Sequence, residues 1–195
     1  MSTFMEDLST EEQSRMEGAL RRYGLNSKDH LCGGLNVPKH AEVTVTRHTN
    51  DNGFHCNILT KDADHAKKLI GVPDAAYTDD SPYTQPLPAK GNKTLTSADF
   101  RPQKHLDELR HIANTYIWGP SHEVAEYKSL IEEHTGQLDL SMHVYTTLDI
   151  RGKLSFPGEQ AVSILAHTIN FYPGGYNDVV GAHLIVNAQI INHKT

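Results

Sequence analysis

The chain has 195 residues, of which 37% are hydrophobic and 22% charged, and its formal net charge is -6 at pH 7. This length allows one or two compact units, and the apolar content is enough to bury a core. The acidic balance and the lack of any run of five or more Lys or Arg exclude a surface that tracks a phosphate backbone, so nucleic acid is not an expected partner.

The N-terminal segment carries acidic residues and has no apolar stretch of the kind found in secretory signals. No apolar run approaches the roughly 20 residues needed to span a bilayer. We therefore expect a cytoplasmic protein without a membrane partner. Two cysteines, Cys32 and Cys56, are too few for a disulfide framework, and the sequence favours reduced thiols while leaving one bridge between them open.

Residues 1–71 are predicted to form an N-terminal α/β portion. Ser9 and Glu12 have the spacing of a capping box, which predicts an amphipathic helix over residues 10–23. A β-hairpin is expected next, because alternating apolar residues flank a turn-forming Asn-Asp-Asn-Gly segment. Val43 and Val45 precede this turn, and Phe54, Cys56 and Ile58 follow it. A short helix is expected over residues 62–70.

The middle of the chain is predicted to be a linker followed by a helical hairpin. Residues 72–100 hold four prolines among small polar residues, so we expect a long loop or linker there. Residues 101–136 show helical apolar spacing on both sides of Gly119-Pro120. Leu106, Leu109, Val124 and Ile131 are the expected packing positions of the two helices.

Residues 137–195 are predicted to form an all-β domain, because the apolar period changes to two after Gly136. The apolar positions also recur at a nearly constant offset. Val144, Ile164 and Leu184 lie twenty residues apart, and Leu148, Ile169 and Ile190 lie twenty-one apart. Such an offset favours a β-solenoid with rungs of about twenty residues. An antiparallel meander or β-sandwich would imitate it at every second strand. The expected class is α+β.

One stretch resembles the rungs of right-handed parallel β-helix proteins. Gly152-Lys153-Leu154-Ser155-Phe156-Pro157-Gly158 fits a corner of the form G-x-L-x-x-P-G, and strand-like segments lie on either side within residues 148–169. The resemblance implies stacked rungs and names no activity.

Thirteen histidines raise the question of a metal site. His30, Cys32, His40, His48, His55 and Cys56 could supply nitrogen and sulfur ligands near the expected hairpin. Two pairs on the expected helices, His105 with Glu108 and His122 with Glu126, could do the same between helices. Neither spacing matches a zinc-finger or Glu-x-x-His pattern, so we expect no metal and no other cofactor.

Two kinds of function fit these features. The first is a non-enzymatic binding or assembly module that forms a homo-oligomer and takes a carbohydrate or other small polar ligand on the Tyr-rich loop. Its expected ligand-binding residues are Tyr172, Tyr176, Asn177 and Asp178. The second is a carbohydrate-active or metal-dependent enzyme. Its catalytic candidates are Asp139, His143, Asp149, Arg151 and His167.

Overall fold

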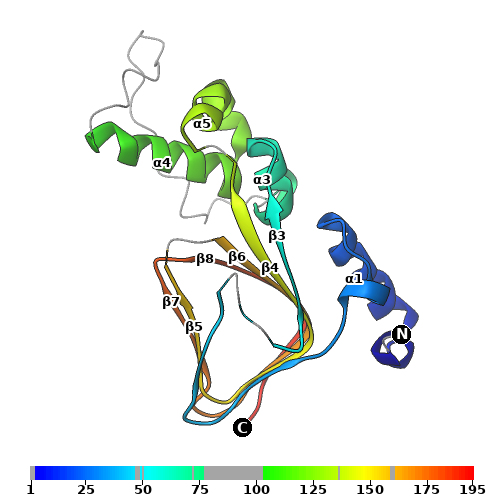
Figure 1. Cartoon of the computed structure of the whole chain (residues 1–195). Helices are drawn as coiled ribbons and strands as arrows, with labels where there is room; N and C mark the ends of the chain where they lie inside the picture. Colours follow the sequence, from blue (N-terminus) through cyan, green and yellow to red (C-terminus); the bar gives the residue numbers. More distant parts are fainter. Residues whose placement is uncertain are drawn as a thin grey trace. The chain divides into compact units, whose positions relative to one another are not determined.

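The fold is described from a computed structural model of the chain (Figure 1). The described residues are 3–46, 49, 51–71, 73–76, 103–135, 137–158 and 161–195. Backbone contacts divide the chain into two compact units. The first unit comprises Met1–Ile58 together with Asp139–Thr195, and the second comprises Leu59–Leu138. The N-terminal portion and the C-terminal strands therefore belong to one unit.

The expected α+β class is confirmed, with helices in the N-terminal and central parts and strands throughout the C-terminal part. The helices are α1 (Thr10–Arg22), α2 (Ser27–His30), α3 (Ala63–Ile70), α4 (Gln103–Trp118) and α5 (Lys128–Thr135), with 3₁₀ segments η1 (Thr3–Asp7), η2 (Asp74–Ala76) and η4 (Ser121–Tyr127). The strands are β1 (Leu35–Val37), β2 (Glu42–Thr44), β3 (Phe54–Leu59), β4 (Asp139–Ile150), β5 (Lys153–Pro157), β6 (Ala161–Phe171), β7 (Tyr176–Val180) and β8 (His183–His193).

The strands of the first unit form two sheets. One has the order β1-β4-β6-β8, with β3 also paired to β4, and the other has the order β2-β5-β7. Every pair whose register is described is parallel. From β4 to β8 the chain alternates between the two sheets, as Figure 1 shows. Apolar side chains from both sheets form one core, which contains Val37, Val45, Tyr145, Leu148, Ile150, Leu154, Phe156, Val162, Ile164, Ala166 and Ile169.

The register between strands differs from the twenty-residue step expected from the sequence. Leu140 lies beside Ala161, a step of 21, and Ala161 lies beside His183, a step of 22. Because successive residues of a strand face opposite sides, a change of one residue in the step moves a side chain to the other face. The expected inward column is therefore wrong at Val144, which pairs with Leu165 and lies outside the core cluster.

Burial on both faces of β4 and β6 explains this error. Parallel strands that are covered on both sides carry nearly continuous apolar runs, so alternation does not fix their register. On β6 the covering element is α1, which packs against β6 and β8 and buries Met16 and Leu20 completely. Tyr23, at the end of α1, accepts a hydrogen bond from Asn187 Nδ2 at 3.0 Å. The capping box expected at Ser9 is present, and the helix begins and ends within one residue of its expected limits.

The expected N-terminal hairpin is not formed. β2 pairs with β5 and β3 pairs with β4, so the two strands belong to different sheets. Before β3, the Asp51 side chain instead accepts a hydrogen bond from the Gly53 amide at 2.7 Å. Local alternation predicted the strands correctly but could not identify partners about a hundred residues away.

A ladder of polar side chains follows the same register. Asn36, Asp149, Asn170 and Asn192 occupy equivalent positions of β1, β4, β6 and β8. Asn192 Nδ2 donates to Asn170 Oδ1 at 2.9 Å, and Asn170 Nδ2 donates to Asp149 Oδ1 at 2.7 Å. Each amide thus satisfies its neighbour, as in stacked Asn ladders of parallel sheets.

The second unit is helical. α4 packs against α3, η4 and α5, and its core contains Ala63, Leu109, Ile112, Ala113, Tyr116, Val124, Tyr127, Leu130 and Ile131. The second helix expected after Pro120 is divided, because Val124 has a non-helical φ of -126°. The Lys67 ammonium caps the C-terminus of α4, because Nζ donates to the Tyr116 and Gly119 carbonyls at 2.9 and 2.8 Å.

Some expectations lie outside the described residues. These include most of the linker expected over 72–100 and the side chains of His48, His105 and Leu106. None of the described helices is both long and apolar enough to cross a bilayer.

The packing of α4 makes a first prediction. Leu109 is 4% exposed, so Leu109→Ala removes buried methyl groups and should lower the free energy of unfolding of the second unit by about 2–5 kcal/mol. Trp118, the single tryptophan, lies in this unit and reports its unfolding in urea. Lys68→Ala, at an exposed position of α3, is the control and should change stability by less than about 0.5 kcal/mol. Equal effects of the two substitutions would contradict the assignment.

Candidate functional site

Of three neighbouring corners in the first unit, the middle one is shorter than the other two. Between β1 and β2 the corner has four residues, 38–41, and between β6 and β7 it also has four, 172–175. Between β4 and β5 it has two, Arg151 and Gly152. The strands on each side are stacked in register, so the short corner lies between two longer ones. A depression results at the middle corner.

This depression is a pocket of about 330 Å³, which we call the corner pocket. Its lining comes from the three stacked corners and the first residues of the adjoining strands. The lining residues are Lys39, His40, Ala41, Glu42, Arg151, Gly152, Lys153, Pro173, Gly174 and Tyr176. Tyr176 is 53% exposed, so much of its ring is accessible to a ligand.

Close backbone packing fixes the floor of the corner pocket. A Cβ atom at Gly152 would lie 2.3 Å from the Pro38 carbonyl oxygen and 2.4 Å from that of Ala41, so only glycine fits. His40, in the corner between β1 and β2, has a φ of 61°. This left-handed conformation costs a residue other than glycine roughly 1–2 kcal/mol. Strain of this kind is often found at functional sites.

The basic side chains of the corner pocket have different partners. Lys153 Nζ lies 2.7 Å from Asp178 and 3.1 Å from Glu42, so both carboxylates hold it, and their hydrogen bonds raise its pKa. The Arg151 guanidinium stacks on Tyr172, with its carbon 3.6 Å from the ring centroid. This cation–π contact fixes the plane of the guanidinium and leaves its N–H groups free to donate.

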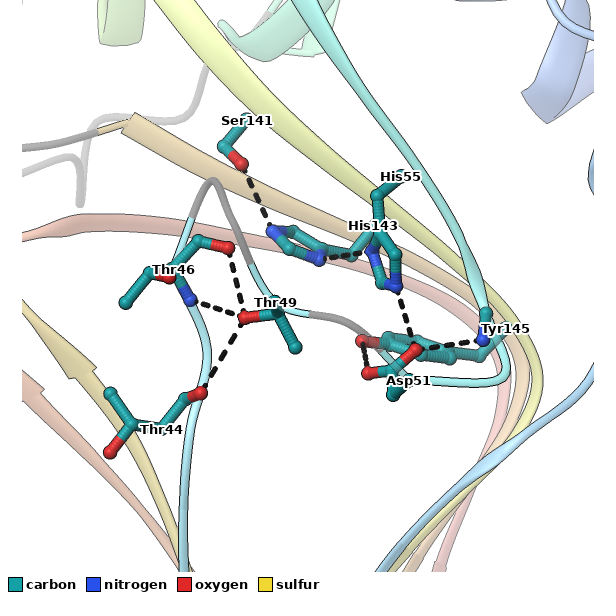
Figure 2. A network of polar contacts seen from close by, with 9 residues as sticks. Thr44, Thr46, Thr49, Asp51, His55, Ser141, His143 and Tyr145 are labelled. Carbon is teal, nitrogen blue, oxygen red and sulfur yellow. Dashed lines mark hydrogen bonds and ion pairs between the residues drawn. The ribbon is translucent and has the colours of Figure 1, made fainter.

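A second cluster, the buried network, joins β3 and β4 to the segment before β3 (Figure 2). His55 Nε2 lies 2.7 Å from Asp51 Oδ1, and His55 Nδ1 lies 2.6 Å from His143 Nδ1. The Ser141 hydroxyl lies 3.0 Å from His143 Nε2. Tyr145 completes the network by donating to Asp51 Oδ2 at 2.9 Å.

Hydrogen-bond chemistry fixes the protons of this network when both imidazoles are neutral. A carboxylate only accepts, so His55 donates from Nε2 to Asp51 and accepts at Nδ1. His143 must then donate from Nδ1 and accept at Nε2 from the Ser141 hydroxyl. The order Asp51, His55, His143, Ser141 is that of a relay that could draw a proton from a serine.

Burial shields Ser141 and His143 of this network from solvent. Ser141 is 3% exposed and His143 is fully buried, so a nucleophilic serine here would have no access to a substrate. The pKa of His143 is lowered from 6.5 to about 4, chiefly by burial and also by nearby His55, while Asp51 opposes the shift. Burial and the Asp51 carboxylate raise the pKa of Tyr145. The network therefore satisfies polar groups inside the core.

The five catalytic candidates have different surroundings. His143 lies in the buried network, Asp149 in the polar ladder and Arg151 at the corner pocket. His167 packs edge-on to Phe4, with ring centroids 5.2 Å apart. Asp139 begins β4.

Of the expected ligand-binding residues, three lie at or beside the corner pocket. Tyr176 lines it, Tyr172 stacks on Arg151, and Asp178 binds Lys153. Asn177 does not face the same way, because it lies in register with Leu154, an inward position of β5.

No group of three or more His, Cys, Asp or Glu side chains is arranged to hold a metal ion within the described ranges. Cys32 and Cys56 are both free thiols. Burial raises the pKa of the Cys56 thiol.

Sequence reasoning did not find Lys39 and Glu42 at the corner pocket, or Asp51 and Ser141 in the buried network. His40 and His55 were expected only as possible metal ligands near the hairpin. No local signal links His55 to His143, which are 88 residues apart.

Comparison with known proteins adds no assignment, because no family pattern, no curated protein and no solved structure matches this chain.

The buried network predicts a pH dependence of stability. Because the pKa of His143 is lower in the folded chain, the unfolded chain binds the extra proton between pH 6.5 and about 4. Stability should therefore be full above pH 6.5 and fall as the pH falls, by about 1.4 kcal/mol per pH unit from this group. Hydrogen exchange of β4 and β6 amides measures the change in the first unit.

His143→Gln should remove most of this pH dependence, because glutamine keeps a donor and an acceptor but does not titrate. His122→Gln, at an exposed position of η4, removes a histidine without burial and is the control. A pH profile that is the same in both variants would show that His143 is not the group responsible.

Proposed function

We propose that this chain is a non-enzymatic assembly and binding module whose strands form a short β-solenoid. In this proposal copies of the chain associate through the uncovered coil at β7 and β8, and the corner pocket takes a saccharide.

The strand arrangement supports the solenoid reading. Consecutive strands alternate between two sheets and pair in parallel with strands about one coil away. An antiparallel meander or sandwich would instead pair neighbours along the chain in opposite directions. The polar ladder through Asp149 and Asn170 adds a side-chain column of the kind that stacked coils carry.

The observation that carries the assembly proposal is the exposure of inward positions in the last coil. Val179 lies beside Phe156, Val186 beside Ile164, and Ile191 beside Ile169. The three partners are 0–2% exposed, whereas Val179, Val186 and Ile191 are 43%, 40% and 55% exposed. Side chains that would be core in a covered coil therefore face solvent.

The occupant we propose is a second copy of the chain. β8 has the sequence HLIVNAQIINH, with no Asp, Glu, Lys, Arg or Pro to oppose strand pairing. Within the described residues its outer edge has no neighbouring strand. Two copies related by a twofold axis would bring their β8 strands together without like-charge repulsion, and closed symmetry would cover both edges at once.

Light scattering at micromolar concentration tests this assembly. The wild-type chain should have the mass of a dimer that dissociates on dilution, and Val186→Lys should be a monomer because a charge at the edge opposes pairing. Leu59→Lys is the control, since Leu59 is 55% exposed but lies outside β7 and β8. A monodisperse wild-type monomer at every concentration would refute the assembly.

A second function is favoured by the corner pocket. An exposed tyrosine beside convergent polar groups in a concave site suits a sugar, which stacks its ring on the aromatic face and hydrogen-bonds at its edges. Tyr176 supplies the ring, and Arg151 and Lys39 supply donors. The enzymatic alternative has weaker support, because the Ser141 and His143 pair is buried and the catalytic candidates have separate partners.

Calorimetric titration with cellotriose tests the saccharide site. Tyr176→Ala should weaken binding by about tenfold, since it removes the stacking surface, whereas Tyr176→Phe should bind as the wild type does. Val180→Ala is the control, because Val180 is exposed on the same strand but does not line the pocket. Equal affinity of Tyr176→Ala and wild type would place the saccharide elsewhere.

A further inference from the structure

The charges of the corner pocket are not balanced. Lys153 is held by both Glu42 and Asp178, so these three groups pair with one another and carry a net charge of −1. Within the described part of the chain, Arg151 and Lys39 form no ion pair, and both line the pocket. Arg151 is held in place by Tyr172 through its face, which leaves the edge of the guanidinium available. A fixed cation without a carboxylate partner favours an anionic ligand.

We propose that the corner pocket selects an acidic saccharide, binding a sugar carboxylate through Arg151 while Tyr176 contacts the sugar ring. This inference rests on the saccharide site proposed above and adds the charge of the ligand.

The geometry fits a carboxylate in particular. The guanidinium is planar, and its paired N–H groups match the two oxygens of a carboxylate in a bidentate contact. Lys39, in the four-residue corner before β2, adds a second positive charge to the lining. Glu42 and Asp178 share the single charge of Lys153, so this triad keeps one net negative charge, which the two positive charges of Arg151 and Lys39 outweigh.

The corner also holds Arg151 from its backbone. The Arg151 amide donates to the Val37 carbonyl at 3.0 Å, which ties the short corner to the coil beside it. The Tyr172 amide donates to the Ile150 carbonyl at 2.9 Å, which brings the Tyr172 ring over the guanidinium. The backbones of Arg151 and Tyr172 are thus both fixed by main-chain hydrogen bonds, so the stacked pair is arranged before a ligand binds.

Two matched trisaccharides separate the charge from the rest of the ligand. A β-1,4-linked glucuronate trisaccharide has the linkage of cellotriose and carries a carboxylate in place of each hydroxymethyl group. Calorimetry at low ionic strength should give at least about tenfold tighter binding of the glucuronate trisaccharide, because charge-assisted hydrogen bonds are stronger than neutral ones. The preference should decrease in 0.5 M sodium chloride, since salt screens the attraction.

Arg151→Gln should reduce this preference to within about twofold, because glutamine keeps a hydrogen-bond donor for the saccharide but removes the charge that attracts the carboxylate. Lys39→Gln, at an exposed position, should reduce it by about threefold and provides a variant whose fold is not at risk. Arg22→Gln, on the exposed surface of α1, removes the same charge elsewhere and should leave the preference unaltered.

The outcomes distinguish this inference from the proposed saccharide site. Binding of both trisaccharides with equal affinity overturns the acidic preference and leaves the saccharide site in place. Failure of both to bind removes the site and the inference together. The preference for the glucuronate trisaccharide could also persist in Arg151→Gln and Lys39→Gln, or fall equally in Arg22→Gln. Either result shows that the corner pocket does not bind the carboxylate.

Discussion

Parallel pairing in two sheets at once is the constraint on which the first unit depends. Each successive strand from β4 to β8 must pair in register with an earlier strand of its own sheet, although the steps along the chain differ. The step is 21 between β4 and β6, 23 between β5 and β7, and 22 between β6 and β8. Only the corners can absorb the difference, so the lengths of the corners follow from the pairing of the strands.

Polar groups inside such a structure must find partners at the same register. Ser141, His143 and Tyr145 face the interior at positions where β6 carries Val162, Ile164 and Ala166. His143 bonds Ser141, His55 of β3 bonds His143, and Asp51 accepts from Tyr145. These hydrogen bonds explain why Asp51, expected in a turn, has a side chain that is only 12% exposed.

Much of the local structure was predictable from the sequence, and the long-range structure was not. The capping box at Ser9, the helices of the second unit and the strands after Gln137 follow from spacing alone. The register was missed because both faces of β4 and β6 are apolar, so a one-residue error carried no signature. Tyr172, Tyr176 and Asp178 were found by composition, whereas Lys39 and His40 reach the pocket only through pairing of β2 with β5.

The two-residue corner lies between two longer corners, and the lengths of the longer corners are not constrained by the core. Residues added to 38–41 or 172–175 would raise a wall of the pocket without moving a paired strand, as the variation in step already shows. The floor cannot vary in the same way, because Gly152 has no room for a side chain. The depth and outline of the corner pocket could therefore change by insertion or deletion in these two turns, while the hydrophobic core stayed the same.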